Sequence, residues 1–369
     1  MVADSERDAN MLYATGLFVP DPFIWLKSGR RPLLVMSDLE IDRARAQAPH
    51  CRVAALSRIQ NTLRREGIPS PRPAHVIRRL LRRKSIRAVT VPENFPLGLA
   101  TELEQLGVRI RLRAGTFFPE RETKSAAEIR HIAGALAMAE AGMAAAVQAL
   151  RRSKIGRRRQ LVYRGAPLTS ERLRAVIDGA VLQAGGLAAN TIVAGGRQSC
   201  APHERGHGPL RAHEPIILDI FPRSQATGYF GDITRTVVRG RAGEAARKLY
   251  DTVRRGQQIA FQRIRAGTAT AEVHRAVREF FARVGYKTGR RRGRMEGFFH
   301  GTGHGLGLEI HEAPRLGAFS TGALKAGHVV TVEPGLYYRQ IGGVRLEDVA
   351  LVTGGGAKNL TRFEKVLEI

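Results

Sequence analysis

The chain is poor in cysteine and lacks long apolar runs. Among its 369 residues there are only two cysteines, Cys51 and Cys200, too few for a disulfide framework, so we expect a reducing, cytoplasmic compartment. The stretch from Met1 to Asn10 is acidic and polar, without the basic and apolar regions of a signal peptide. No run approaches the roughly 18 apolar residues that a membrane helix needs, so no membrane is expected as a partner.

Several motifs are also absent, and each absence excludes a class of site. There is no CxxC pair, which disfavours a structural zinc knuckle, and no helix carrying HExxH, which disfavours a thermolysin-like zinc site. No aromatic-interleaved or DNA-reading motif accompanies the basic runs of the chain.

What the chain has in excess is positive charge. It holds 60 lysines and arginines against 33 acidic residues, a formal net charge of +27, with runs at Arg78–Lys84, Arg151–Arg159 and Arg290–Arg294. Such charge attracts nucleic acid without sequence preference, so this partner stays open. Because no recognition motif accompanies the runs, we favour the simpler interpretation that arginine is used wherever a solvated cation is tolerated.

The sequence pattern of residues 1–120 predicts a small α/β domain, because short apolar runs alternate with helical patterns. Arg31–Met36 and Ala88–Val91 are predicted strands, and Leu39–Ala48 and Ala74–Arg83 are predicted helices. The proline-containing stretch Phe117–Thr123 is the predicted linker to residues 121–369.

Residues 121–369 predict an α+β domain with a curved antiparallel sheet, because long helices are interspersed with hairpin-like strands. The predicted helices are Ser125–Arg152, Ser170–Gln183, Glu244–Ile264 and Ala271–Val284. The predicted strands are Pro215–Phe221, Ile233–Val238, His328–Val332 and Val344–Val352.

Four acidic residues lie in or beside these apolar strands: Asp219, Asp232, Glu333 and Glu347. An unpaired buried charge costs several kcal/mol, so acids seldom occupy such positions without a compensating group. One such acid would be ordinary at an edge strand, but four of them predict a metal site, because a divalent ion is the largest charge available to compensate them.

A histidine cluster supports the same prediction. His300, His304 and His311 lie within twelve residues, in the segment HGTGHGLGLEIHEAP. The glycines on either side of His304 are expected to let the backbone come close to a ligand or a metal.

Four segments resemble the metal-site blocks of the superfamily that contains Xaa-Pro aminopeptidase, prolidase and methionine aminopeptidase, and they occur in the family order. They are DIFPRSQATGYFGDITRT, HGTGHGLGLEIHEAP, TVEPGLYY and GGVRLEDVALVT. The resemblance covers about residues 125–369 and implies a pita-bread (creatinase/aminopeptidase) fold for 121–369. VPDPFIWLKSGRRPLLVMSDLE resembles the leading domain of the proline-specific members, which implies a creatinase-type α/β domain for 1–120.

The resemblance also assigns roles to individual residues. It implies five metal ligands, of which two bridge both ions: Asp219, Asp232, His304, Glu333 and Glu347, with Asp232 and Glu347 bridging. It implies catalytic roles for His203, His311 and Glu333, and substrate-binding roles for His300 and Arg345.

The activity implied is hydrolysis of the amino-terminal bond of a short peptide, with a preference for Xaa-Pro and for a free amino terminus. Two divalent ions would serve as cofactors. One histidine among hard oxygen ligands suits Mn²⁺ or Co²⁺, with Zn²⁺ as a third candidate. The resemblance also implies a homodimer.

One departure from the family pattern concerns Asp219 and Asp232, which are thirteen residues apart, two more than in many members. The extra residues fall in Pro222–Gly228, a predicted hairpin loop. An insertion of two residues preserves the alternation of strand faces, so both carboxylates can still point the same way.

Three alternatives stay open at this stage. A creatinase-type hydrolase would act on a small molecule without metal, although creatinase lacks the five ligands. A methionine-aminopeptidase-like enzyme commonly lacks a leading domain of this length. A basic pita-bread binding module would recognise protein or RNA without cleaving it.

Overall fold

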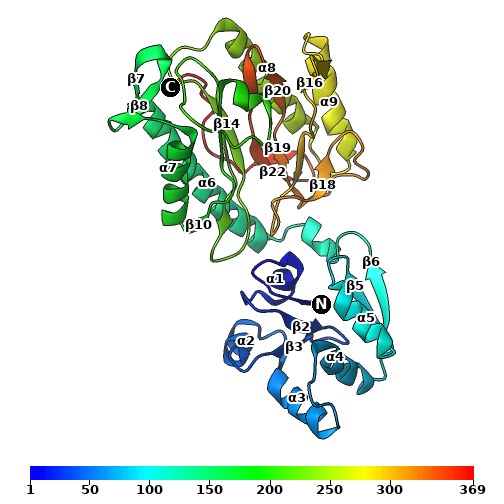
Figure 1. Cartoon of the computed structure of the whole chain (residues 1–369). Helices are drawn as coiled ribbons and strands as arrows, with labels where there is room; N and C mark the ends of the chain where they lie inside the picture. Colours follow the sequence, from blue (N-terminus) through cyan, green and yellow to red (C-terminus); the bar gives the residue numbers. More distant parts are fainter. The chain divides into compact units, whose positions relative to one another are not determined.

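A division between Pro119 and Glu120 separates two units, each with its own hydrophobic core, in the computed structural model, which describes all 369 residues (Figure 1). We call Met1–Pro119 the leading unit and Glu120–Ile369 the larger unit.

The leading unit is an α/β structure built around a four-stranded sheet in the order β1-β2-β3-β4, in which only β3 and β4 run parallel. A separate parallel pair is formed by β5 and β6. The strands are β1 (Val2–Ala3), β2 (Phe23–Leu26), β3 (Leu33–Met36), β4 (Arg52–Ala55), β5 (Ala88–Pro92) and β6 (Arg109–Arg113). The helices are α1 (Ala9–Thr15), α2 (Ile41–Gln47), α3 (Leu56–Arg65), α4 (Pro73–Arg82) and α5 (Leu97–Gln105).

The larger unit begins with the long helix α6 (Ala126–Arg152), which follows a short 3₁₀ turn at Pro119–Glu122. Ser125 starts the helix because its hydroxyl accepts a hydrogen bond from the N–H of Glu128, while the Glu128 carboxylate accepts one from the N–H of Ser125. Contrary to the sequence expectation, α6 is long and apolar enough to span a membrane by length and composition. Half of its most apolar stretch is buried inside this unit.

Helices α6 and α7 (Ser170–Gln183) pack on a three-stranded antiparallel sheet in the order β11-β12-β14. These strands are β11 (Ile192–Gly195), β12 (Ile216–Ile220) and β14 (Ile233–Val237). Smaller strands beside them are β7 (Lys154–Ile155), β8 (Leu161–Tyr163), β9 (Ala166–Pro167), β10 (Gly186–Leu187) and β13 (Arg223–Ser224).

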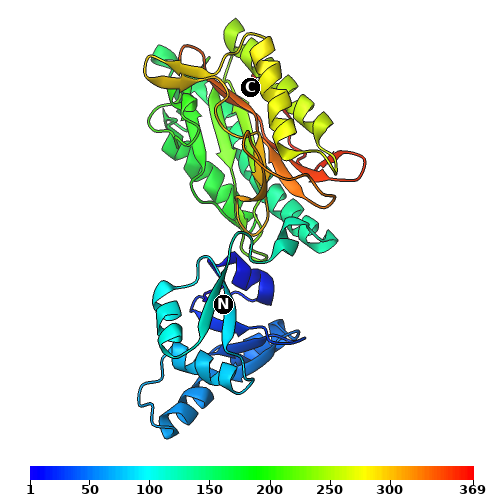
Figure 2. The same ribbon diagram turned by 90° about the vertical axis from the view of Figure 1, so that its right-hand side faces the viewer.

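Helices α8 (Glu244–Arg263) and α9 (Thr270–Arg283) pack on the second half of the unit, where an antiparallel sheet has the order β18-β17-β19-β22-β23 (Figure 2). Its strands are β17 (Gly303–Gly305), β18 (Glu312–Leu316), β19 (Val329–Val332), β22 (Asp348–Val352) and β23 (Ala357–Asn359). Two hairpins complete the unit: β15 (Gly289–Arg291) with β16 (Arg294–Glu296), and β20 (Gly335–Tyr338) with β21 (Gly342–Arg345).

The predicted α+β organisation with antiparallel sheets is confirmed, but one predicted strand is wrong. Val344–Val352 is not continuous: β21 ends at Arg345 and β22 begins at Asp348. The main-chain N–H of Glu347 instead donates to the carbonyl of Thr234 in β14, at 3.1 Å. This interruption places Glu347 where the two halves of the unit meet.

Candidate metal centre

Both halves of the larger unit contribute to one acidic cluster. Asp219 lies in β12 and pairs in register with Thr234 of β14, and Asp232 immediately precedes β14. From the second half, His304 lies in β17 and Glu333 directly follows β19. Together with Glu347 between β21 and β22, these are the five residues that the sequence resemblance assigned to metal.

Four of these residues, Asp232, His304, Glu333 and Glu347, have ligand atoms close to one another. One ligand atom from each of Asp232, His304 and Glu347 lies within 4.8 Å of the others. The Nε2 atom of His304 is 3.3 Å from Oε1 of Glu333 and 3.7 Å from Oδ2 of Asp232. Nδ1 of His304 lies 3.1 Å from the carbonyl of Gly305, so it is the nitrogen suited to carry the proton, leaving the Nε2 lone pair directed at the acids.

Burial and mutual repulsion make it unfavourable for the carboxyl groups of the cluster to ionise. Burial and the neighbouring acids, Glu347 foremost, hold the pKa of Asp232 well above its ordinary value. Burial, followed by Glu333 and Asp219, raises the pKa of Glu347 in the same way, and burial raises the pKa of Glu333 to about 7. Burial lowers the pKa of His304 to about 3, so this imidazole stays neutral and able to act as a ligand.

Two carboxylate oxygens of the cluster are buried without any hydrogen-bond partner: Oδ1 of Asp219 and Oε1 of Glu347. Their companion oxygens are satisfied, by Arg345 at 2.7 Å and by the hydroxyl of Thr234 at 2.7 Å. Arg345 is the one cation paired with the four acids. Orphaned oxygens and uncompensated negative charge are what divalent ions with oxygen ligands would correct, so the residues present fit such ions.

The glycines beside His304 have a different purpose from the one predicted. A Cβ atom on Gly303 would lie 1.9 Å from the carbonyl oxygen of Thr331, and one on Gly305 would lie 2.2 Å from that of Ala313. The glycines therefore admit the backbones of adjoining segments and do not open space for a ligand. They hold His304 close to β19, so that it lies beside Glu333.

A polar chain extends from the acids to His300. The phenol oxygen of Tyr337 lies 2.9 Å from Nε2 of His300 and accepts a hydrogen bond from Arg345 at 3.1 Å. Arg345 in turn binds Asp219. The sequence reasoning missed Tyr337, since an aromatic residue in a strand predicts core packing. Its position four residues after Glu333, in TVEPGLYY, was the available signal.

The other two predicted histidines lie at the exposed side of the site. The ring of His311 meets that of His304 edge to face, with centroids 4.4 Å apart. Burial, with Arg315 next in effect, lowers the pKa of His311 and keeps it neutral. His203 is exposed on a loop after Pro202, whose carbonyl accepts a hydrogen bond from Arg345 at 3.3 Å. The letters HExxH do occur at residues 203–207, but on this loop, where the two histidines do not share a helix face.

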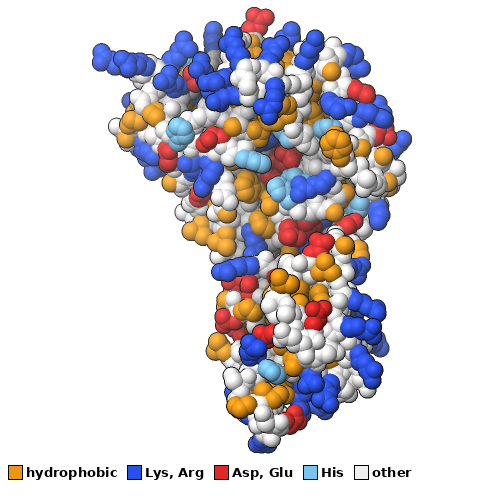
Figure 3. Space-filling view, turned by 45° about the vertical axis from the view of Figure 1, so that its right-hand side comes forward, with side chains coloured by type: hydrophobic (Ala, Val, Ile, Leu, Met, Phe, Trp, Pro, Cys, Tyr) orange, Lys and Arg blue, Asp and Glu red, His pale blue; other side chains and the backbone are white.

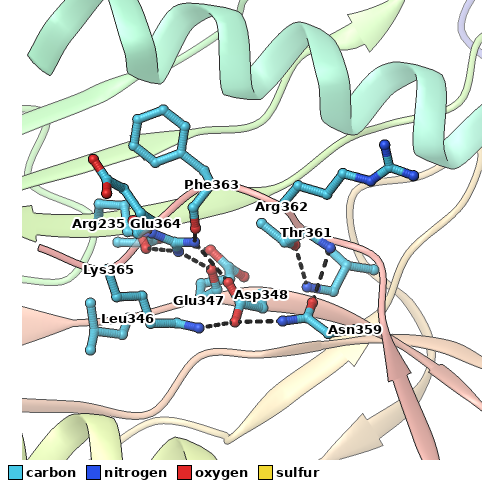
Figure 4. A network of polar contacts seen from close by, with 12 residues as sticks. Arg235, Leu346, Glu347, Asp348, Asn359, Thr361, Arg362, Phe363, Glu364 and Lys365 are labelled. Carbon is cyan, nitrogen blue, oxygen red and sulfur yellow. Dashed lines mark hydrogen bonds and ion pairs between the residues drawn. The ribbon is translucent and has the colours of Figure 1, made fainter. Parts of the chain in front are cut away.

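A second buried network fixes the backbone of Glu347 (Figure 4). The guanidinium of Arg235, in β14, donates to the main-chain carbonyl of Glu347 at 2.6 Å and to the carboxylate of Asp348 at 2.9 Å. It also donates to the carbonyls of Phe363 and Glu364, so the carboxy-terminal segment is tied to the same side chain. Through Arg235, strand β14, the start of strand β22 and the carboxy-terminal segment are thus joined beside Glu347.

Comparison with known proteins places this geometry in context. The sequence model described as metallopeptidase family M24 matches residues 130–354. A stretch of 179 residues, 48% of this chain, is 34% identical to an Xaa-Pro dipeptidase of Pyrococcus furiosus and covers 49% of that protein. The chain thus spans about half the length of the curated relatives it matches.

Two solved structures share the fold over nearly the whole chain. An X-Pro aminopeptidase from Thermotoga maritima superposes with a TM-score of 0.83 at 22% identity, over 100% of this chain and 97% of its own. An Xaa-Pro dipeptidase from Bacillus anthracis gives 0.83 at 23% identity, over 98% of this chain and 93% of its own. These likenesses confirm the predicted fold, including the leading α/β unit.

Proposed function

The chain belongs to metallopeptidase family M24, and from this premise we propose that it is a two-metal peptidase that hydrolyses the amino-terminal bond of short peptides, preferring Xaa-Pro. The observation that carries the proposal is the buried acidic cluster at His304, which Asp232, Glu333 and Glu347 form with that imidazole. Asp219 adds a fourth acid, and Arg345 is the one cation paired with the set. The relatives' names support the preference for proline. A creatinase-type hydrolase without metal would not need these ligands.

We assign Asp219, Asp232, His304, Glu333 and Glu347 as the residues that would hold two divalent ions. Two divalent ions supply Lewis acidity that makes water a nucleophile at neutral pH. Mn²⁺ or Co²⁺ suits the donor set best, with Zn²⁺ next. The free amino terminus of the peptide is drawn to this acidic end of the site, which limits cleavage to the first bond.

Glu333 is assigned the proton transfer. Its side chain is 20% exposed, against 12% for Asp219 and 6% for Asp232, so among these three it has the best contact with solvent. It takes a proton from the attacking water and delivers it to the proline nitrogen, while the hydroxyl joins the acyl carbon and the C–N bond breaks.

The neutral imidazole of His311, beside His304, donates a hydrogen bond to the oxygen that gains charge during attack. His203, exposed on the loop after Pro202, is assigned the role of orienting the peptide. His300 and Arg345, joined through Tyr337, contact the part of the substrate beyond the reacting carbonyl. We also predict a homodimer and a cytoplasmic location.

The test compares purified wild-type protein with Glu333→Ala, each assayed with added Mn²⁺ on Ala-Pro, Ala-Pro-Ala, Ala-Ala and Met-Ala. Wild type is expected to cleave the Xaa-Pro peptides, and loss of Glu333 should reduce kcat by at least about 100-fold. Glu279→Ala, which removes an exposed acid on α9, is the matched control and should retain activity. Undiminished turnover by the Glu333 variant would overturn the assigned role, and preferential cleavage of Met-Ala would overturn the preference for proline.

A further inference from the structure

A large cavity adjoins the candidate metal centre in the larger unit. Its volume is about 1420 Å³, and Tyr337 and Pro202 form part of its wall. Both residues also bind Arg345, the first through its phenol oxygen and the second through its carbonyl. Arg345 therefore connects the wall of the cavity to Asp219 of the candidate metal centre.

The cavity wall is strongly basic. Only two acids line it, Glu204 and Glu296, and each already accepts a hydrogen bond from a main-chain N–H, of Gly206 and of Arg339. Six cationic side chains line it, all exposed and none within ion-pair distance of a carboxylate: Arg197, Lys287, Arg291, Arg292, Arg294 and Arg339. Figure 3 shows Lys and Arg side chains crowding one end of the larger unit, above a recess where acidic and histidine side chains are visible.

The hairpin that carries three of these arginines concentrates like charge. Arg291 of β15 pairs in register with Arg294 of β16, and the connection is a two-residue turn at Arg292 and Gly293, both with positive φ. Like charges directly opposite each other on an antiparallel pair destabilise it. This arrangement costs folding stability, so a general habit of using arginine on the surface does not account for it, whereas an anionic ligand would.

The direction of the peptide selects what can enter the cavity. An enzyme that removes one residue holds the amino terminus at the metal centre, so only the part after the scissile bond can reach a separate cavity. Resting on the function proposed above, we propose that this basic cavity binds carboxylates in the downstream part of the peptide, so that the enzyme prefers substrates carrying negative charge after the Xaa-Pro bond.

The carboxylate could belong to an acidic side chain or to the carboxy terminus of the peptide, and the substrate series separates these sources. The assay uses the metal-loaded full chain with Ala-Pro-Glu-Glu-Ala, Ala-Pro-Gln-Gln-Ala and Ala-Pro-Lys-Lys-Ala, each as free acid and as amide. We expect kcat/KM for the glutamate peptide to exceed that for the glutamine peptide by about tenfold at low salt, mostly through KM. A preference that survives amidation identifies the side chains, and one that depends on the free terminus identifies the carboxy terminus.

The arginines are tested by Arg291→Gln/Arg292→Gln/Arg294→Gln, which should bring the ratio of kcat/KM values for the glutamate and glutamine peptides close to one. The matched control is Arg157→Gln/Arg158→Gln/Arg159→Gln, which removes the same charge from an exposed run outside the cavity and should keep the ratio. Equal cleavage of the glutamate and glutamine peptides by wild type would overturn the inference and leave the proposed function intact. The same holds if the ratio of their kcat/KM values falls equally in both triple variants.

A binding measurement keeps the inference testable if no peptide is cleaved. N-acetylated, fluorescein-labelled Ala-Pro-Glu-Glu-Ala, compared with its glutamine analogue, is titrated with both triple variants and wild type in an anisotropy assay. Selective, salt-sensitive binding of the glutamate peptide that only the hairpin variant loses would support the inference. Binding of a single-stranded oligonucleotide that displaces this peptide at lower concentration, and that the same variant loses, would overturn it in favour of nucleic acid.

Discussion

Arg345 donates a hydrogen bond to Oδ2 of Asp219 at 2.7 Å, joining β21 to β12. The same guanidinium binds the phenol oxygen of Tyr337, which lies beside His300. One buried cation thus links the acidic cluster, through Tyr337, to His300. It offsets part of the negative charge but leaves Oδ1 of Asp219 without a partner, so the site still favours cations.

The raised carboxyl pKa values predict that metal stabilises the fold more at high pH. In the metal-free protein, Glu333 has a pKa of about 7 against 4.5 for the ordinary side chain, so between these values the folded state binds more protons than the unfolded state. Its stability therefore falls as the pH rises through that window, and Asp232 and Glu347 add in the same direction. Metal ions bind the ionised form and remove this penalty.

Thermal unfolding with EDTA and with Mn²⁺ measures this effect. The gain in Tm on adding Mn²⁺ should be clearly larger at about pH 8 than at about pH 5.5, since each carboxyl can add up to about 1.4 kcal/mol per pH unit in the window. An equal gain at both pH values would contradict the raised pKa values.

Replacing Tyr337 with phenylalanine should impair catalysis more than stability. The ring stays in place, but His300 and Arg345 lose the hydroxyl between them. We expect kcat/KM on Ala-Pro to fall by about 10-fold to 100-fold, and the free energy of unfolding to fall by only about 1 kcal/mol. Tyr250→Phe is the control, because that buried hydroxyl on α8 has no hydrogen-bond partner and its removal should be neutral.

Gly303→Ala should be strongly destabilising. The new Cβ would lie 1.9 Å from the Thr331 carbonyl oxygen, which belongs to β19 and cannot move alone. We expect a loss of about 3 kcal/mol or more in the free energy of unfolding by urea. Gly354→Ala, where nothing lies within 4 Å and the backbone needs no positive φ, should change it by less than about 0.5 kcal/mol. Similar stability of the two variants would refute the close-approach explanation.

Arg235→Met tests the network behind the metal centre. Arg235 is fully buried and pairs with Asp348, so its removal leaves that carboxylate with less compensation and frees the carbonyl of Glu347. The expected loss is about 3–5 kcal/mol of unfolding free energy, accompanied by weaker metal retention. The control, Arg247→Met, breaks the solvent-screened ion pair with Glu368, where little change in stability is expected. Unchanged metal retention in a folded Arg235 variant would show that this network does not support metal binding.

Local patterns specified the helices closely. The predicted Ser170–Gln183 coincides with α7, whose N-cap Thr169 accepts a hydrogen bond from the N–H of Arg172. Strands were harder to delimit. The run Val344–Val352 is mostly apolar and contains no glycine or proline, so its sequence predicts one strand, and only the contacts of Glu347 with β14 reveal the break.

The sequence by itself determined which residues had to be brought together. Asp219, Asp232 and Glu347 stand out because a charge inside an apolar strand is costly unless another group compensates it, and this cost is visible in the order of residues alone. It also determined that helices and antiparallel strands would alternate, through periodicity.

Tertiary structure alone decided which groups those charges meet. Tyr337 bridges His300 and Arg345, and Arg291 faces Arg294 beside a basic cavity, because sheet register and loop paths place them there. It also decided that Gly303 serves strand packing and not ligand access. The physical reason is that hydrogen bonds and Coulomb interactions act over a few ångströms in space. His300 and Tyr337 are 37 residues apart along the chain, and Asp219 and Arg345 are 126 apart, so only the complete fold brings them into contact.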